Sequence, residues 1–164
     1  MSTYVPIEGV ITEIEPIRFG RDRPDNCCML MMSVRGARGS IVNFIVDTNT
    51  YFIDNFTARR GDRIIAFYDS SLATPAIYPP QYRAVAVARQ VANRFIIIDS
   101  FNRNFMNSGG SIRVNIGQGT RIIMTNNQTF LCDIVGRDVI VVYSIATFIF
   151  PAIINPNQII VLCR

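Results

Sequence analysis

Short apolar runs, separated by Gly, Asn, Asp and Pro, recur along the whole chain. The runs are rich in Val, Ile, Phe and Tyr, and none shows a sustained 3.6-residue apolar period behind a capping residue. This spacing is typical of an all-β barrel or sandwich. The strands that we expect are Gly9–Ile14, Met29–Val34, Ser40–Val46, Arg63–Tyr68, Arg83–Ala88, Phe95–Phe101, Ser111–Ile116, Arg121–Met124, Val139–Tyr143 and Gln158–Leu162.

Turn-forming residues indicate how these strands are joined. Arg35–Gly39 predicts a hairpin, and Asn107–Gly110 predicts its counterpart in the second half of the chain. Asn126–Asn127 is a further turn, because Asn tolerates positive φ. Residues Thr50–Phe56 have the length of a short helix, but their β-branched and aromatic side chains argue against one.

The second half of the chain repeats landmarks of the first half in the same order, which predicts an internal duplication. We expect two similar five-stranded barrels or sandwiches, OB-like or SH3-like, over residues 1–90 and 91–164. No Gly or Pro interrupts residues 85–98, so we expect the two units to pack as one body. The matched landmarks are Gly39–Ile41 with Gly110–Ile112, Thr48 with Thr120, Gly61–Tyr68 with Gly136–Tyr143, Ala73–Thr74 with Ala146–Thr147, Pro75–Ile77 with Pro151–Ile153, Pro80 with Pro156 and Val85 with Val161.

Composition removes several classes of chemistry. The chain of 164 residues has no His and no Lys, so all 16 of its basic residues are Arg. Imidazole metal ligands, His general bases, P-loop lysines and Schiff-base lysines are therefore excluded. No carboxylate pair or glycine-rich loop marks an active site, so we expect a protein that is not an enzyme and needs no cofactor.

Nucleic-acid binding is the alternative function. The net charge of +4 is small and scattered, which favours a solvated surface over a nucleic-acid interface. OB-like barrels nevertheless bind single strands through exposed aromatic and basic side chains, although strand alternation puts most of these aromatics in the core. The residues concerned are Phe19, Tyr51, Phe52, Phe101 and Phe105, with Arg18, Arg21, Arg23, Arg59, Arg60, Arg63, Arg94 and Arg103.

The four cysteines, Cys27, Cys28, Cys132 and Cys163, do not have the spacing of a zinc site. Without His, none has the usual partner of a catalytic thiol. They are either apolar residues of a reduced protein or sites of disulfides between subunits. An adjacent pair in a loop and a cysteine next to the C-terminus are accessible positions for such cross-links.

Two loops are candidate contact surfaces. The first has two prolines flanked by tyrosines, with Tyr78–Pro79 a possible cis peptide, and it either docks a partner or packs on its own barrel. The second is wholly apolar, and it is either an exposed contact surface or part of the core. The candidate interface residues are Tyr78, Pro79, Pro80, Tyr82, Arg83, Phe148, Phe150, Ile153 and Ile154.

Several segments together resemble a group of small uncharacterised β proteins encoded by spore-forming Gram-positive bacteria. The resemblance covers most of the chain and contains no known catalytic residue. It implies a bacterial origin and an association with spores. The segments are Asn43–Val46, Thr50–Phe52, Gly61–Asp62, Phe67–Asp69, Ile77–Val85, Val114–Ile116 and Val141–Tyr143.

These observations predict a structural protein that assembles with copies of itself into a filament, ring or surface layer. The start of the chain lacks an ordinary secretion signal, and no apolar run reaches the roughly 18 residues that cross a membrane. We therefore expect no membrane span. The expected setting is extracellular or on the spore surface, with the cytoplasm as the alternative.

Overall fold

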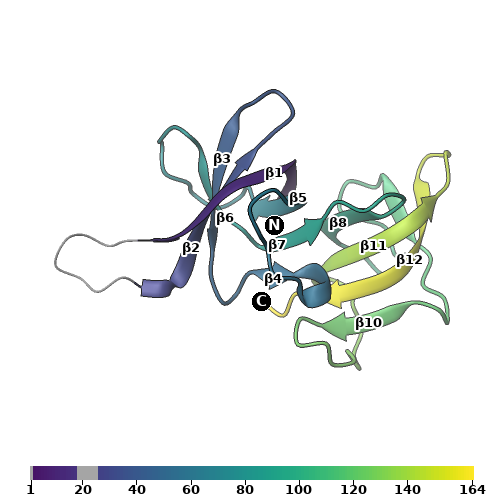
Figure 1. Ribbon diagram of the computed structural model, residues 1–164. Coiled ribbons are helices and arrows are strands. Elements are labelled where there is room, and N and C mark those ends of the chain that lie inside the picture. Colours follow the sequence, from purple (N-terminus) through teal and green to yellow (C-terminus); the bar gives the residue numbers. More distant parts are fainter. Residues whose placement is uncertain (1, 18–25) are drawn as a thin grey trace. The chain divides into compact units, whose positions relative to one another are not determined.

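The chain divides into two compact units, Met1–Gln90 (unit 1) and Val91–Arg164 (unit 2). The computed structural model describes residues 2–17 and 26–164 (Figure 1). In these ranges the regular elements are β-strands and one 3₁₀ turn, η1, at Ile53–Asn55. The prediction of an all-β protein is confirmed, and each unit contains a sheet with both parallel and antiparallel neighbours.

Unit 1 contains one sheet with the strand order β4-β7-β5-β1-β2-β3-β6 in its described part. The strands β3 and β6 are parallel, as are β4 and β7, and the remaining neighbours are antiparallel. The short helix considered at Thr50–Phe56 is instead the strand β4 followed by η1. The strand bounds are β1 Tyr4–Ile17, β2 Asn26–Arg35, β3 Ile41–Val46, β4 Tyr51–Phe52, β5 Arg63–Asp69, β6 Gln81–Arg83 and β7 Ala86–Arg89.

The expected strand Arg83–Ala88 is divided between β6 and β7, which bond to different neighbours. β6 pairs with β3, whereas β7 pairs with β5. The two residues between them continue this change of partner, since Ala84 N–H donates to Ile45 O at 2.9 Å and Val85 N–H donates to Phe67 O at 2.8 Å. The chain thus bonds to β3 with one half and to β5 with the other. Because β6 and β7 follow each other in the chain, they link the β3 side of the sheet to the β5 side.

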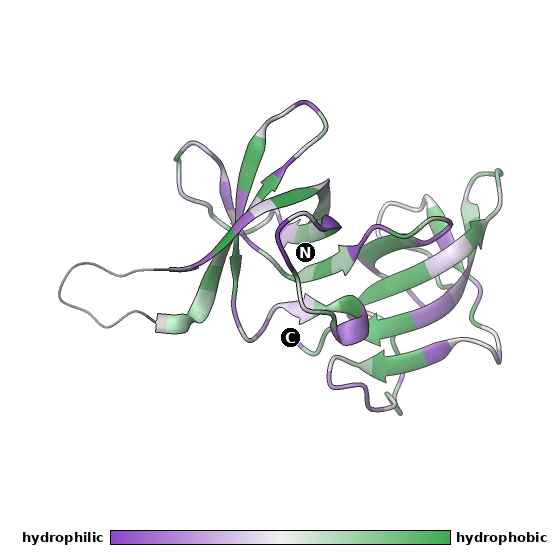
Figure 2. Cartoon of the chain, viewed as in Figure 1, coloured by the Kyte–Doolittle hydropathy of each residue, from purple (hydrophilic) through white to green (hydrophobic). Residues whose placement is uncertain are grey.

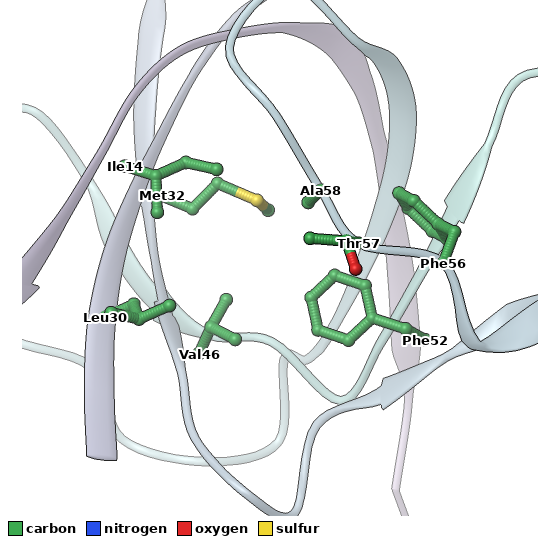
Figure 3. A pocket seen from close by; sticks show the side chains of 8 residues that line it. All are labelled: Ile14, Leu30, Met32, Val46, Phe52, Phe56, Thr57 and Ala58. Carbon is green, nitrogen blue, oxygen red and sulfur yellow. The ribbon is translucent and has the colours of Figure 1, made fainter. Parts of the chain in front are cut away.

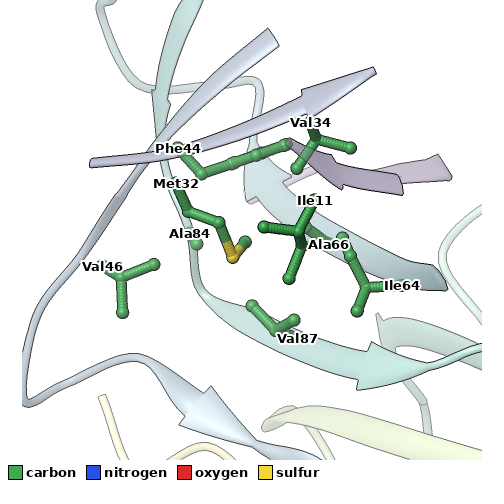
Figure 4. Packing of buried hydrophobic residues seen from close by; sticks show 9 residues of the cluster. All are labelled: Ile11, Met32, Val34, Phe44, Val46, Ile64, Ala66, Ala84 and Val87. Atoms are coloured by element: carbon green, nitrogen blue, oxygen red, sulfur yellow. The ribbon is translucent and has the colours of Figure 1, made fainter. Parts of the chain in front are cut away.

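The core of unit 1 lies on the inward positions of these strands. Along β1, Ile14 packs against the core while its neighbours Glu13 and Glu15 are exposed, and Figure 2 shows changes of colour along the strand. Such a period of two places one side-chain set against the core. The buried cluster in Figure 4 contains Ile11, Met32, Val34, Phe44, Val46, Ile64, Ala66, Ala84 and Val87.

Unit 2 has the order β10-β12-β11-β8, with β9 also paired to β12. Both β9 and β10 run parallel to β12, while β11 runs antiparallel to it. Phe101, Val114, Val141, Ile154 and Ile159 are among the residues of its buried cluster. The strand bounds are β8 Phe95–Ser100, β9 Ile112–Val114, β10 Arg121–Met124, β11 Asp138–Ala146 and β12 Ala152–Val161.

A glycine precedes each of the strands β5 and β11, and the backbone hydrogen bonds of these two glycines are similar. Gly61 N–H donates to Ile11 O at 2.8 Å, and Gly136 N–H donates to Phe101 O at 2.9 Å. Both glycines have positive φ, 93° and 75°, which other residues rarely adopt. In unit 1, Ile64 pairs with Arg89 and Ala66 with Val87. In unit 2, Val139 pairs with Val161 and Val141 with Ile159, so the strand after each glycine has the same pairing pattern.

The hydrogen bond of Thr120 in unit 2 resembles that of a threonine other than Thr48 in unit 1. The Thr50 hydroxyl donates to Ala84 O at 2.9 Å, and the Thr120 hydroxyl donates to Pro156 O at 3.0 Å. Thr50, and not Thr48, makes in unit 1 the kind of hydrogen bond that Thr120 makes in unit 2. The accepting carbonyl belongs to Ala84 in unit 1 and to Pro156 in unit 2, whereas the sequence match paired Pro80 with Pro156 and Val85 with Val161.

The two cis peptides also fall at equivalent positions. Tyr78–Pro79 and Phe150–Pro151 are both cis. Each precedes the segment that enters a parallel pairing, at Gln81 of β6 and at Ala152 of β12. Pro151 therefore corresponds to Pro79, and the match of Pro75 with Pro151 was wrong. Residue identity alone misled the match here because the loops that precede the two prolines differ in length.

The carboxylate of Asp69, at the end of β5, holds the start of the chain. Asp69 is 7% exposed. Its Oδ1 accepts hydrogen bonds from Thr3 N–H at 3.2 Å, Ser71 N–H at 3.0 Å and the Ser71 hydroxyl at 2.6 Å. Burial by itself raises the pKa of Asp69, but the hydrogen bonds from Ser71, Ser2 and Thr3 outweigh it and leave the pKa below its ordinary value.

We predict that Asp69→Asn lowers the free energy of unfolding at pH 7 by about 1–2 kcal/mol, because hydrogen bonds to a charged acceptor are stronger than those to a neutral one. Since the folded-state pKa is lowered, this stabilisation is present above the unfolded carboxyl pKa of about 3.9 and disappears as pH falls through the folded-state value. Urea unfolding of both proteins across this pH range measures the difference. Glu13→Gln, on an exposed position of β1, is the control. A difference that persists in acid would contradict the assignment.

We predict that Thr50→Val destabilises the protein by about 1–3 kcal/mol, because the buried carbonyl of Ala84 loses its side-chain donor while shape is kept. The exposed Thr48→Val should change the free energy of unfolding by less than about 0.5 kcal/mol. Thermal or urea unfolding compares the two variants. Equal effects would refute the assignment of Thr50 as the bonded residue.

Candidate functional site

The end of β11 and the loop that leads to β12, together residues 145–151, are the most exposed apolar feature of unit 2. We call it the hairpin tip. Phe148 is 107% exposed and Phe150 83%, and Ile145 and Ile149 are also largely exposed. The tip contains no charged residue, and it extends from the paired parts of β11 and β12 in Figure 1. Exposed apolar groups gathered in this way mark contact surfaces.

The base of the hairpin tip is held by backbone and side-chain hydrogen bonds. Thr147 N–H donates to Ile153 O at 3.0 Å, and Ile153 N–H donates in return to the Thr147 hydroxyl at 2.9 Å. Ala152 N–H donates to Ser111 O at 2.9 Å, which ties the loop to the chain before β9. The apolar side chains therefore project from a fixed base, and ordering them on a partner costs less entropy than ordering an unanchored loop.

Ile153 and Ile154 differ from the two phenylalanines. Ile154 is 1% exposed and belongs to the core of unit 2, so its place among the candidate interface residues was wrong. Its side chain points inward because buried and exposed residues alternate in β12 from Ile154 to Asn157. Ile153 is half-buried. Of the apolar loop, Phe148 and Phe150 are the candidates that the structure leaves exposed.

In unit 1, the equivalent loop has a different character. Tyr78 is 86% exposed, whereas Pro79 and Pro80 are half-buried. Tyr82 stacks on Tyr68 with ring centroids 3.8 Å apart, so it packs on its own unit. Burial, and then the hydrogen bond and charge of Tyr82, raise the pKa of Tyr68.

Arg83, the last candidate in this loop, forms an ion pair with Asp47. Its side chain is 58% exposed, so the pair is screened by solvent and adds little stability. Asp47 Oδ1 also accepts a hydrogen bond from Asn49 N–H at 2.9 Å. Arg83 is thus held at the surface beside β3, with one side of its guanidinium engaged.

An apolar pocket of about 220 Å³ opens in unit 1. The strands β1, β2 and β3 supply one wall, and β4 with the chain after η1 supplies the other. The rings of Phe52 and Phe56 meet edge to face with centroids 5.4 Å apart, and the Arg89 guanidinium lies 4.5 Å from the centre of the Phe56 ring. Figure 3 shows the side chains that line it: Ile14, Leu30, Met32, Val46, Phe52, Phe56, Thr57 and Ala58.

The chemistry of this pocket is binding rather than catalysis. Its lining has one hydroxyl, from Thr57, and no ionisable group. A dry apolar cavity of about 150 Å³ is enough to bind benzene. The pocket therefore has room for one phenyl ring or a similar apolar group. Sequence reasoning missed it, because its residues come from five separate segments whose meeting depends on the fold.

All four cysteines lie in the described ranges, where they are exposed and no disulfide joins them. Cys27 and Cys28 lie in β2 and not in a loop, which corrects the expectation for this pair. The register of β1 and β2 shifts here, from Pro16↔Leu30 to Ile17↔Asn26, so both cysteines fall in the irregular part of the strand. The cysteines that we expected in a loop therefore lie in the bulged end of a strand. Intersubunit disulfides stay a prediction.

The aromatic residues considered for nucleic-acid binding are mostly not available for base stacking. Phe101 is buried in the core of unit 2, and Phe105 packs against that core. Phe52 lines the apolar pocket. Tyr51 is half-buried, and the basic residues Arg59, Arg60, Arg63 and Arg103 are exposed while Arg94 is half-buried. Phe19, Arg18, Arg21 and Arg23 lie outside the described residues.

Over residues 2–17 and 26–164, no three His, Cys, Asp or Glu side chains gather closely enough to hold a metal ion. None of the helical segments in these ranges has the length and hydropathy that spanning a bilayer requires. Comparison with known proteins found no matching family model, no matching curated protein and no matching solved structure.

Proposed function

We propose that the protein is a non-enzymatic structural protein whose copies assemble through the hairpin tip of unit 2. The observation that carries the proposal is the exposure of Phe148 and Phe150 on a loop without charge. Water contact with two aromatic rings is unfavourable, and a partner surface removes it. The anchored base of the tip lowers the entropy cost of that contact.

The size of the contact predicts how assembly depends on concentration. Burying one Phe side chain contributes about 1.5–3 kcal/mol, so two contribute about 3–6 kcal/mol. A dissociation constant of 1 mM corresponds to about 4 kcal/mol. The hairpin tip alone therefore supports weak, reversible association. A lasting assembly needs several such contacts or a covalent cross-link.

We further propose that each unit is an OB-like barrel and that the two arose by duplication. The pairing order of unit 1, with a parallel contact between β3 and β6, is that expected for such a barrel. Equivalent glycines, threonines and cis peptides in the two units support a common origin. Related units with different loops suit a head-to-tail contact, because each copy presents two unlike surfaces.

The favoured setting is a spore or cell surface. Support comes from the resemblance to proteins of spore-forming bacteria and from the four exposed thiols, which disulfides between copies would use. In such a setting cross-links convert weak contacts into a permanent layer. The thiols are also compatible with the reducing cytoplasm, where they stay in the thiol form.

A second candidate function is binding of single-stranded nucleic acid. The OB-like strand order of unit 1 favours it, as do the exposed Arg59, Arg60 and Arg63 around the turn before β5. Retention of a single-stranded oligonucleotide that falls steeply with salt would support this function. Absence of retention at low salt would remove it.

We predict that replacing Phe148, Ile149 and Phe150 together by Ser abolishes assembly without unfolding the protein, because these side chains lie outside the core. Sedimentation velocity and negative-stain electron microscopy, with and without reductant, measure assembly. Leu131→Ser, which removes an equally exposed apolar side chain elsewhere in unit 2, is the control and should assemble as the wild type does.

The wild-type protein itself provides the decisive outcome for assembly. Large particles that grow with protein concentration are expected, and an oxidant should make them resist dilution. A wild type that stays monomeric at its highest soluble concentration, both reduced and oxidised, would overturn the proposed function.

A further inference from the structure

The hairpin tip and the pocket have complementary chemistry and size. The tip presents aromatic rings on a loop without charge, and the pocket is a cavity of about 220 Å³ with a lining that is apolar apart from Thr57. Because a cavity of about 150 Å³ accepts benzene, one ring of Phe148 or Phe150 fits with room for part of a neighbouring side chain. Neither surface contains a charge that the contact would bury unpaired.

We propose that the pocket of unit 1 receives the hairpin tip of a second copy of the chain. This inference rests on the proposed function and names the surface that the tip contacts. The tip belongs to unit 2 and the pocket to unit 1, so the contact joins unlike surfaces. A contact of this kind leaves one tip and one pocket free at the ends of every assembly, and growth continues unless a ring closes.

Two short side chains form part of one wall of the pocket. Ala58 and Thr57 follow η1 and lie across from Met32 and Val46, and Figure 3 shows their side chains directed at the same space. Ala58 is half-buried and contributes only a methyl group to this wall. A larger side chain at this position occupies the space that an incoming ring would take.

The test uses two variants that each remove one half of the contact. Ala58→Phe fills the pocket and keeps the tip. The triple Ser variant of Phe148, Ile149 and Phe150 removes the tip and keeps the pocket. Ala37→Phe, which adds the same ring to an exposed turn of unit 1, is the matched control. Thermal unfolding checks that each variant is folded, and Ala58→Leu replaces Ala58→Phe if the larger ring prevents folding.

We expect Ala58→Phe to raise the protein concentration for half-assembly by about 10- to 100-fold, the effect of losing one buried Phe side chain, and the triple Ser variant not to assemble. Ala37→Phe should assemble as the wild type does. An equal mixture of the pocket variant and the tip variant should form a complex with one copy of each, because only one productive contact remains. Sedimentation velocity gives the mass of this complex, and a mixture of pocket variant with wild type should give shortened assemblies.

Other outcomes separate this inference from the proposed function. If Ala58→Phe assembles as the wild type does while the tip variant does not, the tip binds elsewhere, so the inference is wrong and the proposed function stands. The inference is also wrong if Ala58→Phe only abolishes uptake of toluene, followed by NMR, because the pocket then serves a small apolar molecule. A mixture of the two variants that forms no pair overturns it as well.

If the wild type is monomeric, both the inference and the proposed function fail, and insertion of a chain's own tip becomes the explanation for any toluene exclusion. If both variants assemble as the wild type does, neither surface mediates assembly. The mixing experiment thus distinguishes a failure of this inference from a failure of the proposed function.

Discussion

The structure of each unit depends on one segment that has hydrogen-bond partners on both of its sides. In unit 1, β6 pairs with β3 and β7 pairs with both β5 and β4, with the change made at Ala84 and Val85. In unit 2 the single strand β12 bonds to β11 on one side and to β9 and then β10 on the other. A segment with neighbours on both sides has its backbone groups satisfied without water, so it can be buried. Ala84–Ala88 and Ile159–Leu162 are accordingly buried.

The two units differ in the loop that leads this segment into the interior. The loop that leads into it lies outside the pairing, so its residues are not constrained by the core. Unit 1 fixes the beginning of the loop with Asp69 and Ser71 and its end with the stacked Tyr82. Unit 2 instead extends β11 and β12 into a hairpin, which carries Phe148 and Phe150 beyond the sheet. Equivalent positions therefore present polar, anchored chemistry in one unit and apolar, exposed chemistry in the other.

The sequence contains most of the strand pattern, because period-two burial and turn residues act locally. Gly61 and Gly136 could be matched from sequence, since a positive φ before a strand requires a particular residue type. Thr48 and Thr50 could not be distinguished, because only the tertiary partner Ala84 selects between them. For the same reason, neither the burial of Ile154 nor the pocket could be predicted from the sequence.

The asymmetry between the units also bears on how cross-linking would relate to assembly. Cys27 and Cys28 lie in β2 three and two residues before Leu30, which lines the pocket. A tip seated in the pocket would bring the surface of a second copy toward this end of β2. Where that surface carries a cysteine, oxidation would favour a bond between correctly placed copies, because the held thiol has a high effective concentration. Weak apolar contact would select the partner, and the disulfide would make the choice permanent.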